Sequence, residues 1–116
     1  MANKEVTFLP GVPIWMQKYC VKLHKLLAPE WTVVVRKVKK PVDSDDEDVD
    51  AIVDPRFEYL DADMTFGPYV RNNTNGRRTV AHEFLHLALH GLVENTTSVI
   101  EEQTVTRLAK VIEHLT

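Results

Sequence analysis

The chain has 116 residues, a formal net charge of −3 and a single cysteine. This length predicts one domain, spanning residues 1–116, with a modest core. The acidic balance argues against nucleic acid or an anionic membrane as a partner. A lone cysteine cannot form an internal disulfide, and the sequence shows neither a targeting segment nor an apolar stretch of membrane-spanning length. We therefore expect a cytoplasmic protein; no feature of the sequence indicates its oligomeric state.

The first half of the chain alternates between helix-forming and strand-forming segments. Residues 1–12 are expected to form an extended arm. A helix follows, because Pro13 suits a first helical turn and Pro29 stops the apolar periodicity between them. The β-branched and aromatic residues of 31–38 predict a strand. The acidic run at 43–48 predicts a solvated loop, since like charges repel one another.

Two further strand segments and two turns come next. Residues 51–53 and 56–65 have strand composition, and a change of parity between them indicates either a bulge or two short strands. The Gly-Pro pair at 67–68 and the Asn-Gly pair at 75–76 both predict turns. These turns separate the strands from the C-terminal part of the chain.

Two helices are expected to close the chain, at about 80–90 and about 99–115. Strands gathered together with helices on either side predict an α+β domain. We expect an N-terminal helix, a short and mostly antiparallel sheet, and the two closing helices.

The first of these closing helices contains the motif His-Glu-x-x-His, formed by His82, Glu83 and His86. Residues four apart on a helix point the same way, so both imidazoles can bind one cation. Imidazole is a good ligand for Zn²⁺, and bound zinc lowers the pKa of its water towards neutrality. Glu83 is placed to take a proton from that water and to deliver it to a leaving amine. The motif predicts a zinc site with Glu83 as catalytic base and acid.

The helical context strengthens this interpretation. Thr79 is expected to cap the helix and Gly91 to end it. The helix is apolar on nearly all sides, through Val80, Phe84, Leu85, Leu87, Leu89 and Leu92. Polar groups inside such a buried helix are costly unless they are paired or bind a metal. The alternative is an ordinary helix with partly exposed polar residues, because short motifs recur by chance.

The third metal ligand must come from elsewhere. His90 shares the helix face but lies about 12 Å along the axis from His82, at a rise of ~1.5 Å per residue. His114 is possible only if the last helix runs back past the site. Glu101 and Glu102 are better candidates. Ser98 to Glu101 reads as a capping box, which gives Glu101 a structural role and makes Glu102 the preferred ligand, with Glu101 as the alternate.

Residues 77–90, reading Arg-Arg-Thr-Val-Ala-His-Glu-Phe-Leu-His-Leu-Ala-Leu-His, resemble the active-site helix of ImmA/IrrE-like metallopeptidases. Their motif reads approximately Arg-Phe-Thr-x-Ala-His-Glu-x-x-His. The group is common in phages and mobile elements. Its compact relatives, the minigluzincins, have a helix, a short sheet, the active-site helix and a glutamate helix, which is the order predicted for this chain. The resemblance implies a zinc metallopeptidase of the gluzincin type.

In those families the third ligand is a Glu with a small apolar residue three positions later and a large one six positions later. Glu102, with Val105 and Leu108, matches that pattern. Two positions depart from it. Thr106 stands where relatives often have Asn or Asp, although Thr can still hydrogen-bond a ligating histidine. Leu85 stands where a glycine is usual. The resemblance covers about residues 77–112.

The implied reaction is hydrolysis of a peptide bond in a peptide or protein substrate, with Zn²⁺ as cofactor. An extended substrate is expected alongside an exposed strand edge in the region 61–70. Tyr69 is a candidate transition-state donor, although most tyrosines serve in the core or on the surface. Two other functions stay open: a non-catalytic, zinc-stabilised protein-binding module, and a regulatory factor that acts on one partner. Retention of Glu83 favours catalysis, because a structural zinc site does not require it.

Overall fold

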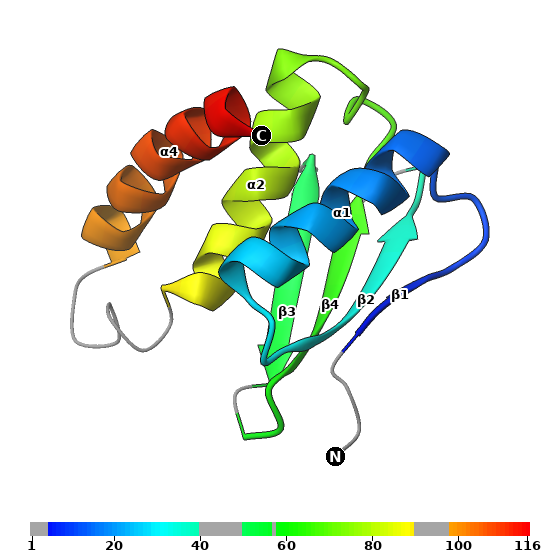
Figure 1. Ribbon diagram of the computed structural model, residues 1–116, viewed down its shortest axis with the longest axis horizontal. Helices are drawn as coiled ribbons and strands as arrows, with labels where there is room; N and C mark the ends of the chain where they lie inside the picture. The colour runs from blue at the N-terminus through cyan, green and yellow to red at the C-terminus, as the bar shows by residue number, and fades with distance from the viewer. Residues whose placement is uncertain (1–4, 40–49, 57, 90–97) are drawn as a thin grey trace.

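The computed structural model describes residues 5–39, 50–56, 58–89 and 98–116, and within them three helices pack with one four-stranded sheet (Figure 1). The α+β expectation is confirmed. The helices α1 and α2 lie across one face of the sheet, and α4 packs beside α2 (Figure 1). The elements in chain order are β1 (Val6–Phe8), α1 (Ile14–Leu27), β2 (Thr32–Lys37), β3 (Ala51–Arg56), β4 (Asp61–Phe66), α2 (Thr74–Ala88) and α4 (Ser98–Leu115).

The sheet has the strand order β1-β2-β4-β3 and is mixed. β1 pairs parallel to β2, β2 pairs parallel to β4, and only β3 and β4 pair antiparallel. The expectation of a mostly antiparallel sheet is therefore wrong. The physical reason is the crossover: α1 carries the chain back so that β1 and β2 run in the same direction.

The structure defines two extended segments more closely than the sequence did. The N-terminal arm contains β1, whose Val6–Phe8 pair with Val33–Val35 of β2. The parity change within 51–65 reflects two strands, β3 and β4, rather than a bulge, and Leu60 in the turn between them has a φ of 51°. The predicted strand at 31–38 is confirmed as β2. The acidic run at 43–48 lies outside the described residues.

Alternation along the strands sets the core. Val33, Val35, Ala62, Met64 and Phe66 are each at most 1% exposed and face the helices. The intervening residues of β2 and β4 point to the opposite face of the sheet and are only half-buried. The helices complete the core with apolar side chains that include Met16, Leu23, Val80, Phe84 and Val105. None of the described helices is both long enough and apolar enough to cross a bilayer.

The helix that carries the motif begins earlier than predicted. Asn73, not Thr79, is its N-cap, and the Asn73 side chain accepts a hydrogen bond from the Gly76 backbone N–H at 2.8 Å. Thr79 lies in the second turn, where its hydroxyl donates to the Asn75 carbonyl at 3.0 Å. The Asn-Gly pair at 75–76, predicted to be a turn, belongs to the first helical turn.

Glycine is required at position 76 because a Cβ there would lie 1.7 Å from the Arg71 carbonyl oxygen. The chain before α2 thus passes directly over the first helical turn. At the other end, Leu89 is the C-cap of α2, and both Gly91 and His90 lie outside the described residues. With these ends, the motif residues lie in the C-terminal half of α2.

Candidate metal centre

The two motif histidines share one face of α2. His82 and His86 bring their Nε2 atoms to 3.2 Å, with ring centroids 4.9 Å apart. The buried side of α2 in this region is formed by Val80, Ala81, Phe84, Leu85 and Leu87. The two histidines lie outside this buried set and are half-buried.

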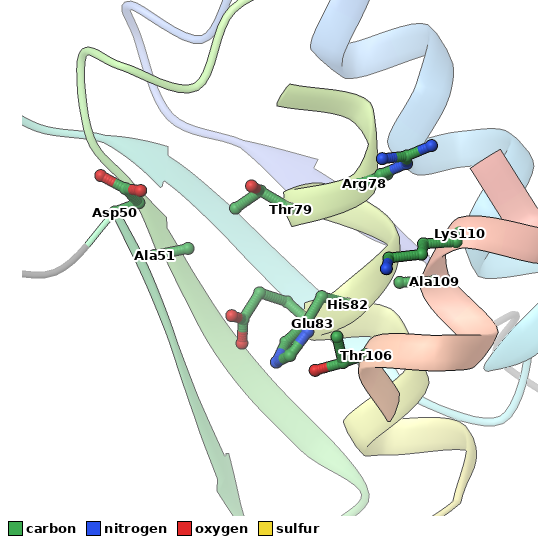
Figure 2. Close-up of a pocket in the computed structure, with 9 residues that line it drawn as sticks. All are labelled: Asp50, Ala51, Arg78, Thr79, His82, Glu83, Thr106, Ala109 and Lys110. Atoms are coloured by element: carbon green, nitrogen blue, oxygen red, sulfur yellow. The ribbon is translucent and has the colours of Figure 1, made fainter. Parts of the chain in front are cut away.

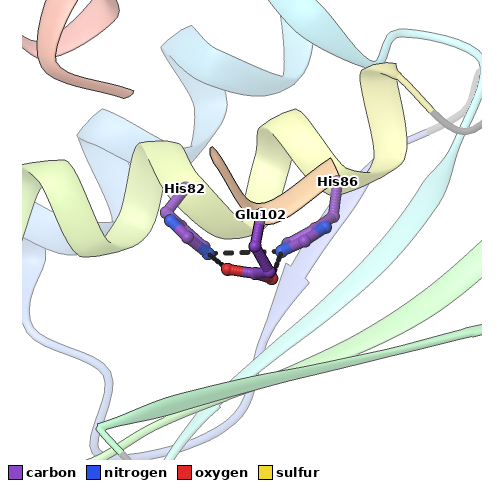
Figure 3. A group of neighbouring side chains, drawn as sticks. All are labelled: His82, His86 and Glu102. Carbon is purple, nitrogen blue, oxygen red and sulfur yellow. Dashed lines mark hydrogen bonds and ion pairs between the residues drawn. The ribbon is translucent and has the colours of Figure 1, made fainter. Parts of the chain in front are cut away.

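Glu102 reaches this pair from α4 (Figure 3). Its Oε1 lies 2.9 Å from His86 Nε2 and its Oε2 lies 3.3 Å from His82 Nε2. Val105 and Ala109 of α4 are buried, at 0% and 3% exposure. They follow Glu102 by three and seven positions, so they fix the rotation of α4 that turns Glu102 towards α2. The Glu102 side chain itself stays 55% exposed.

The structure therefore brings together His82, His86 and Glu102, one ligand atom from each lying within 4.8 Å of the others. The structure does not describe the side chain of Glu101. Only the position of Glu102 can therefore be compared with the predicted ligand. His114 is exposed and lies twelve residues further along α4, about 18 Å from Glu102 along the axis. It does not belong to this group.

The donor set fits a zinc ion. Zinc binds imidazole nitrogen and carboxylate oxygen at about 2.0–2.2 Å with tetrahedral geometry, which places neighbouring donor atoms about 3.3 Å apart. The two Nε2 atoms are 3.2 Å apart, close to this value, and each lies 3.3 or 2.9 Å from a different oxygen of Glu102. With one ligand atom taken from each residue, the three atoms lie within 4.8 Å of one another, so a small adjustment of the side chains would bring them onto one ion. In a tetrahedral site, two imidazoles and one carboxylate would leave the fourth position for water. The exposure of Glu102 keeps that side of the group accessible.

Electrostatics favour the metal-binding form of His82. Burial lowers the pKa of this imidazole, and the negative charge of Glu102 only partly opposes the effect. The positive charge of His86, when protonated, lowers it further. His82 is thus biased towards the neutral state, which is the state that donates a lone pair to a metal.

Glu83 stands apart from the three donors and is 8% exposed. Burial raises the pKa of its carboxyl group to about 7, with a smaller opposing effect from His86. Figure 2 shows its carboxylate beside the His82 ring and directed towards the strands rather than towards α4. A carboxyl group with this pKa can both accept and donate a proton near neutral pH.

A pocket of about 300 Å³ adjoins Glu83 and His82 (Figure 2). It lies between the start of β3, the first half of α2 and the middle of α4. Its lining residues are Asp50, Ala51, Arg78, Thr79, His82, Glu83, Thr106, Ala109 and Lys110. Thr106 is one of the two positions that depart from the ImmA/IrrE-like pattern. It lines the pocket near His82, and Figure 2 shows its hydroxyl facing the pocket.

The predicted substrate edge is wrong in detail. Residues 61–66 form β4, which is flanked on both sides by β2 and β3 and so offers no free edge. The edge strand next to the pocket is β3, whose first residue Ala51 lines it. Tyr69 is 74% exposed and is not among the residues that line the pocket.

Sequence reasoning gave no site role to six of the nine pocket residues, among them Arg78, Lys110, Asp50 and Ala51. Arg78 lies one turn before His82, and Lys110 lies two turns after Glu102, so helical periodicity from the ligands was a usable signal for both. Asp50 and Ala51 gave no such signal, because their place beside α2 depends on which strand forms the edge of the sheet.

In comparisons with protein-family models, curated proteins and solved structures, nothing matches this chain. The resemblance to ImmA/IrrE-like metallopeptidases therefore rests on the motif residues themselves.

Proposed function

We propose that the chain is a zinc-dependent metallopeptidase in which His82, His86 and Glu102 hold the metal. The observation that carries the proposal is the convergence of the three donor groups beside a buried carboxyl group: one ligand atom from each lies within 4.8 Å of the others. Two imidazoles and one carboxylate gathered in this way are a donor set that zinc binds. When bound, zinc supplies a Lewis acid that polarises the scissile carbonyl and acidifies water.

Glu83 provides the proton transfers. Its carboxylate accepts a proton from the attacking water, and the resulting carboxylic acid delivers that proton to the leaving nitrogen. A pKa of about 7 suits both directions, because neither protonation state is strongly favoured at neutral pH. Glu83 is not part of the donor group, so its replacement separates catalysis from metal binding.

The substrate lies along β3. This edge strand has one unpaired side within the described sheet, and its first residue lines the pocket beside Glu83. An extended peptide adds there by main-chain hydrogen bonding. Pro55, at the far end of β3, has no N–H to donate, so the usable edge is nearest the pocket. The sequence of α1, the strands, α2 and α4 supports the proposal of a compact gluzincin, although the sheet is mixed. We also propose a cytoplasmic location, with which the free, buried thiol of Cys20 is compatible.

The decisive experiment combines metal content with turnover. Native mass spectrometry should find one zinc per wild-type chain and per His114→Ala chain, but none on His86→Ala. Glu83→Gln should keep the zinc and lose cleavage of a degenerate peptide library by at least about a hundredfold. Zinc retained by His86→Ala would contradict the metal assignment. Turnover retained by Glu83→Gln would contradict the assigned base.

A second function is favoured by one specific observation: the donor group joins two helices. An ion held by α2 residues His82 and His86 and by Glu102 of α4 would fasten these helices together, as in a zinc-stabilised binding module. Chelation distinguishes the two functions. If the chelated protein stays folded yet no longer cleaves, the metal is catalytic; if it unfolds and the zinc-loaded form never cleaves any peptide of the library, the metal is structural.

A further inference from the structure

The pocket beside the donor group has two chemically different walls. Four of its nine lining residues are Ala or Thr, which helps to leave about 300 Å³ open. One acidic residue, Asp50, lies on the β3 side (Figure 2). The opposite wall, formed by α2 and α4, includes the cationic residues Arg78 and Lys110. Figure 2 shows the Lys110 ammonium directed towards the pocket and the Arg78 guanidinium extending away from the β3 side.

These two cations have no ion-pair partner among the described residues. In contrast, the guanidinium groups of Arg36, Arg56 and Arg77 each lie within ion-pair distance of a carboxylate. The Nε of Arg78 is buried and has no hydrogen-bond acceptor in the described part of the chain. A buried N–H without an acceptor costs free energy, so an anion placed within reach of Arg78 would be stabilised there.

We propose that this pocket recognises a carboxylate of the substrate next to the scissile bond, through Arg78 and Lys110. The proposal rests on the proposed peptidase function and adds the substrate class: peptides with Glu or Asp at that position, or peptides whose chain ends there. Both sources offer the same group, a carboxylate that guanidinium and ammonium bind with charge-assisted hydrogen bonds. The small lining residues leave room for the side chain, and the cations select its charge.

Peptide hydroxamates test this without requiring turnover. The hydroxamate anchors each probe on zinc, and the next residue is Glu, Gln or Lys with an amidated C-terminus. A fourth probe has Gln and a free terminal carboxylate. Titration calorimetry on the zinc-loaded protein should show the Glu probe binding roughly tenfold more tightly than the Gln probe, with the Lys probe weakest. If only the fourth probe gains over the Gln amide, the recognised carboxylate is the chain terminus.

Variants on α4 provide the matched comparison. Lys110→Gln should remove most of the Glu-over-Gln preference, and Lys110→Glu should reverse the preference between Glu and Lys probes. Arg107→Gln alters an exposed cation of the same helix that does not line the pocket, and should leave the preference unchanged. Lys110 is exposed, so its replacement should not impair folding; Arg78→Gln supplies a second measurement.

The outcomes separate this proposal from the peptidase function. If zinc binds and peptides are cleaved, but no carboxylate probe binds better than the Gln amide, the carboxylate pocket is refuted and the peptidase function stands. If Lys110→Gln behaves like Arg107→Gln, Lys110 has no role in recognition and the proposal fails. If the protein binds no zinc, both proposals fall together.

Discussion

At the scale of single residues, Glu83 is a carboxyl group whose ionisation is made costly by burial. It is a carboxylic acid in a buried position of an apolar helix, and its pKa is raised to about 7 chiefly by desolvation. In the metal-free protein the folded state therefore binds a proton more tightly than the unfolded state, whose carboxyl group titrates near 4.5. The stability that this proton contributes is fully present below pH 4.5 and is lost as the pH rises through 7.

Glu83→Gln should expose this cost directly. From pH 5 to pH 8 the wild type should lose up to ~3 kcal/mol of unfolding free energy relative to the metal-free variant, because Glu83 titrates and glutamine does not. Urea denaturation in the presence of a chelator measures the difference at each pH. Glu30→Gln, at an exposed carboxyl group, is the control. A difference that does not vary with pH would show that Glu83 is not buried as a neutral acid.

Cys20 allows a second residue-scale prediction. Its side chain is 0% exposed, and burial raises the pKa of the thiol to about 12. Since the thiolate is the reactive form, an aromatic disulfide reagent should fail to label the native protein at pH 8. Labelling should begin only in the urea range where the far-ultraviolet circular dichroism is lost. Cys20 is the sole cysteine, so rapid labelling before unfolding could have no other source and would contradict its burial.

At the scale of elements, α2 depends on a cap that is easily overlooked. Asn73 satisfies the Gly76 N–H, and Gly76 allows the Arg71 carbonyl to pass close to the helix. Asn73→Ala should lower the free energy of unfolding by about 1 kcal/mol. Asn72→Ala removes only an exposed side-chain hydrogen bond to Arg77 and should cost less. Equal losses in urea denaturation for the two variants would remove the special role of Asn73.

The same elements show what a sequence can predict and why the rest is hidden. The periodicities of α1, β2 and α4 are local, and each was predicted within a few residues of its observed ends. The start of α2 was misplaced because Asn-Gly at 75–76 has strong turn propensity, which the packing of Arg71 over Gly76 overrides. β1 has only three residues, and it is a strand only because β2 is beside it.

Some residues of the candidate site could be predicted from the sequence and others could not. His82, Glu83 and His86 could be recognised because their relationship is set by one helix. The packing of two helices along their apolar stripes brings both Glu101 and Glu102 into consideration, and Glu102 was preferred only because a capping box gives Glu101 a structural role. Arg78 and Lys110 could be placed near the site from helical spacing alone. Asp50 could not be predicted, since its place depends on β4 inserting between β2 and β3 and leaving β3 at the edge.

At the scale of the whole molecule, α4 is fastened to the rest of the protein differently at its two ends. Near its C-terminal end, Glu113 lies 3.6 Å from Arg77, and the Tyr19 hydroxyl lies 2.7 Å from the Thr116 hydroxyl. Near its N-terminal end, among the described side chains, Glu102 and the two α2 histidines provide the polar contact. A bound metal would therefore act mainly on the N-terminal half of the helix.

Zinc should accordingly slow amide hydrogen exchange in residues 102–108 more than in residues 109–115. Binding to the folded state alone also raises the free energy of unfolding, by ~4 kcal/mol at a free zinc concentration a thousand times the Kd. Exchange followed by mass spectrometry, with and without zinc, measures the local effect, and thermal unfolding measures the global one. Both effects should persist in Glu83→Gln and in His114→Ala, and both should vanish in His86→Ala, because only that variant removes a ligand. Uniform protection along α4, or protection that survives in His86→Ala, would mean that zinc binds elsewhere on the molecule.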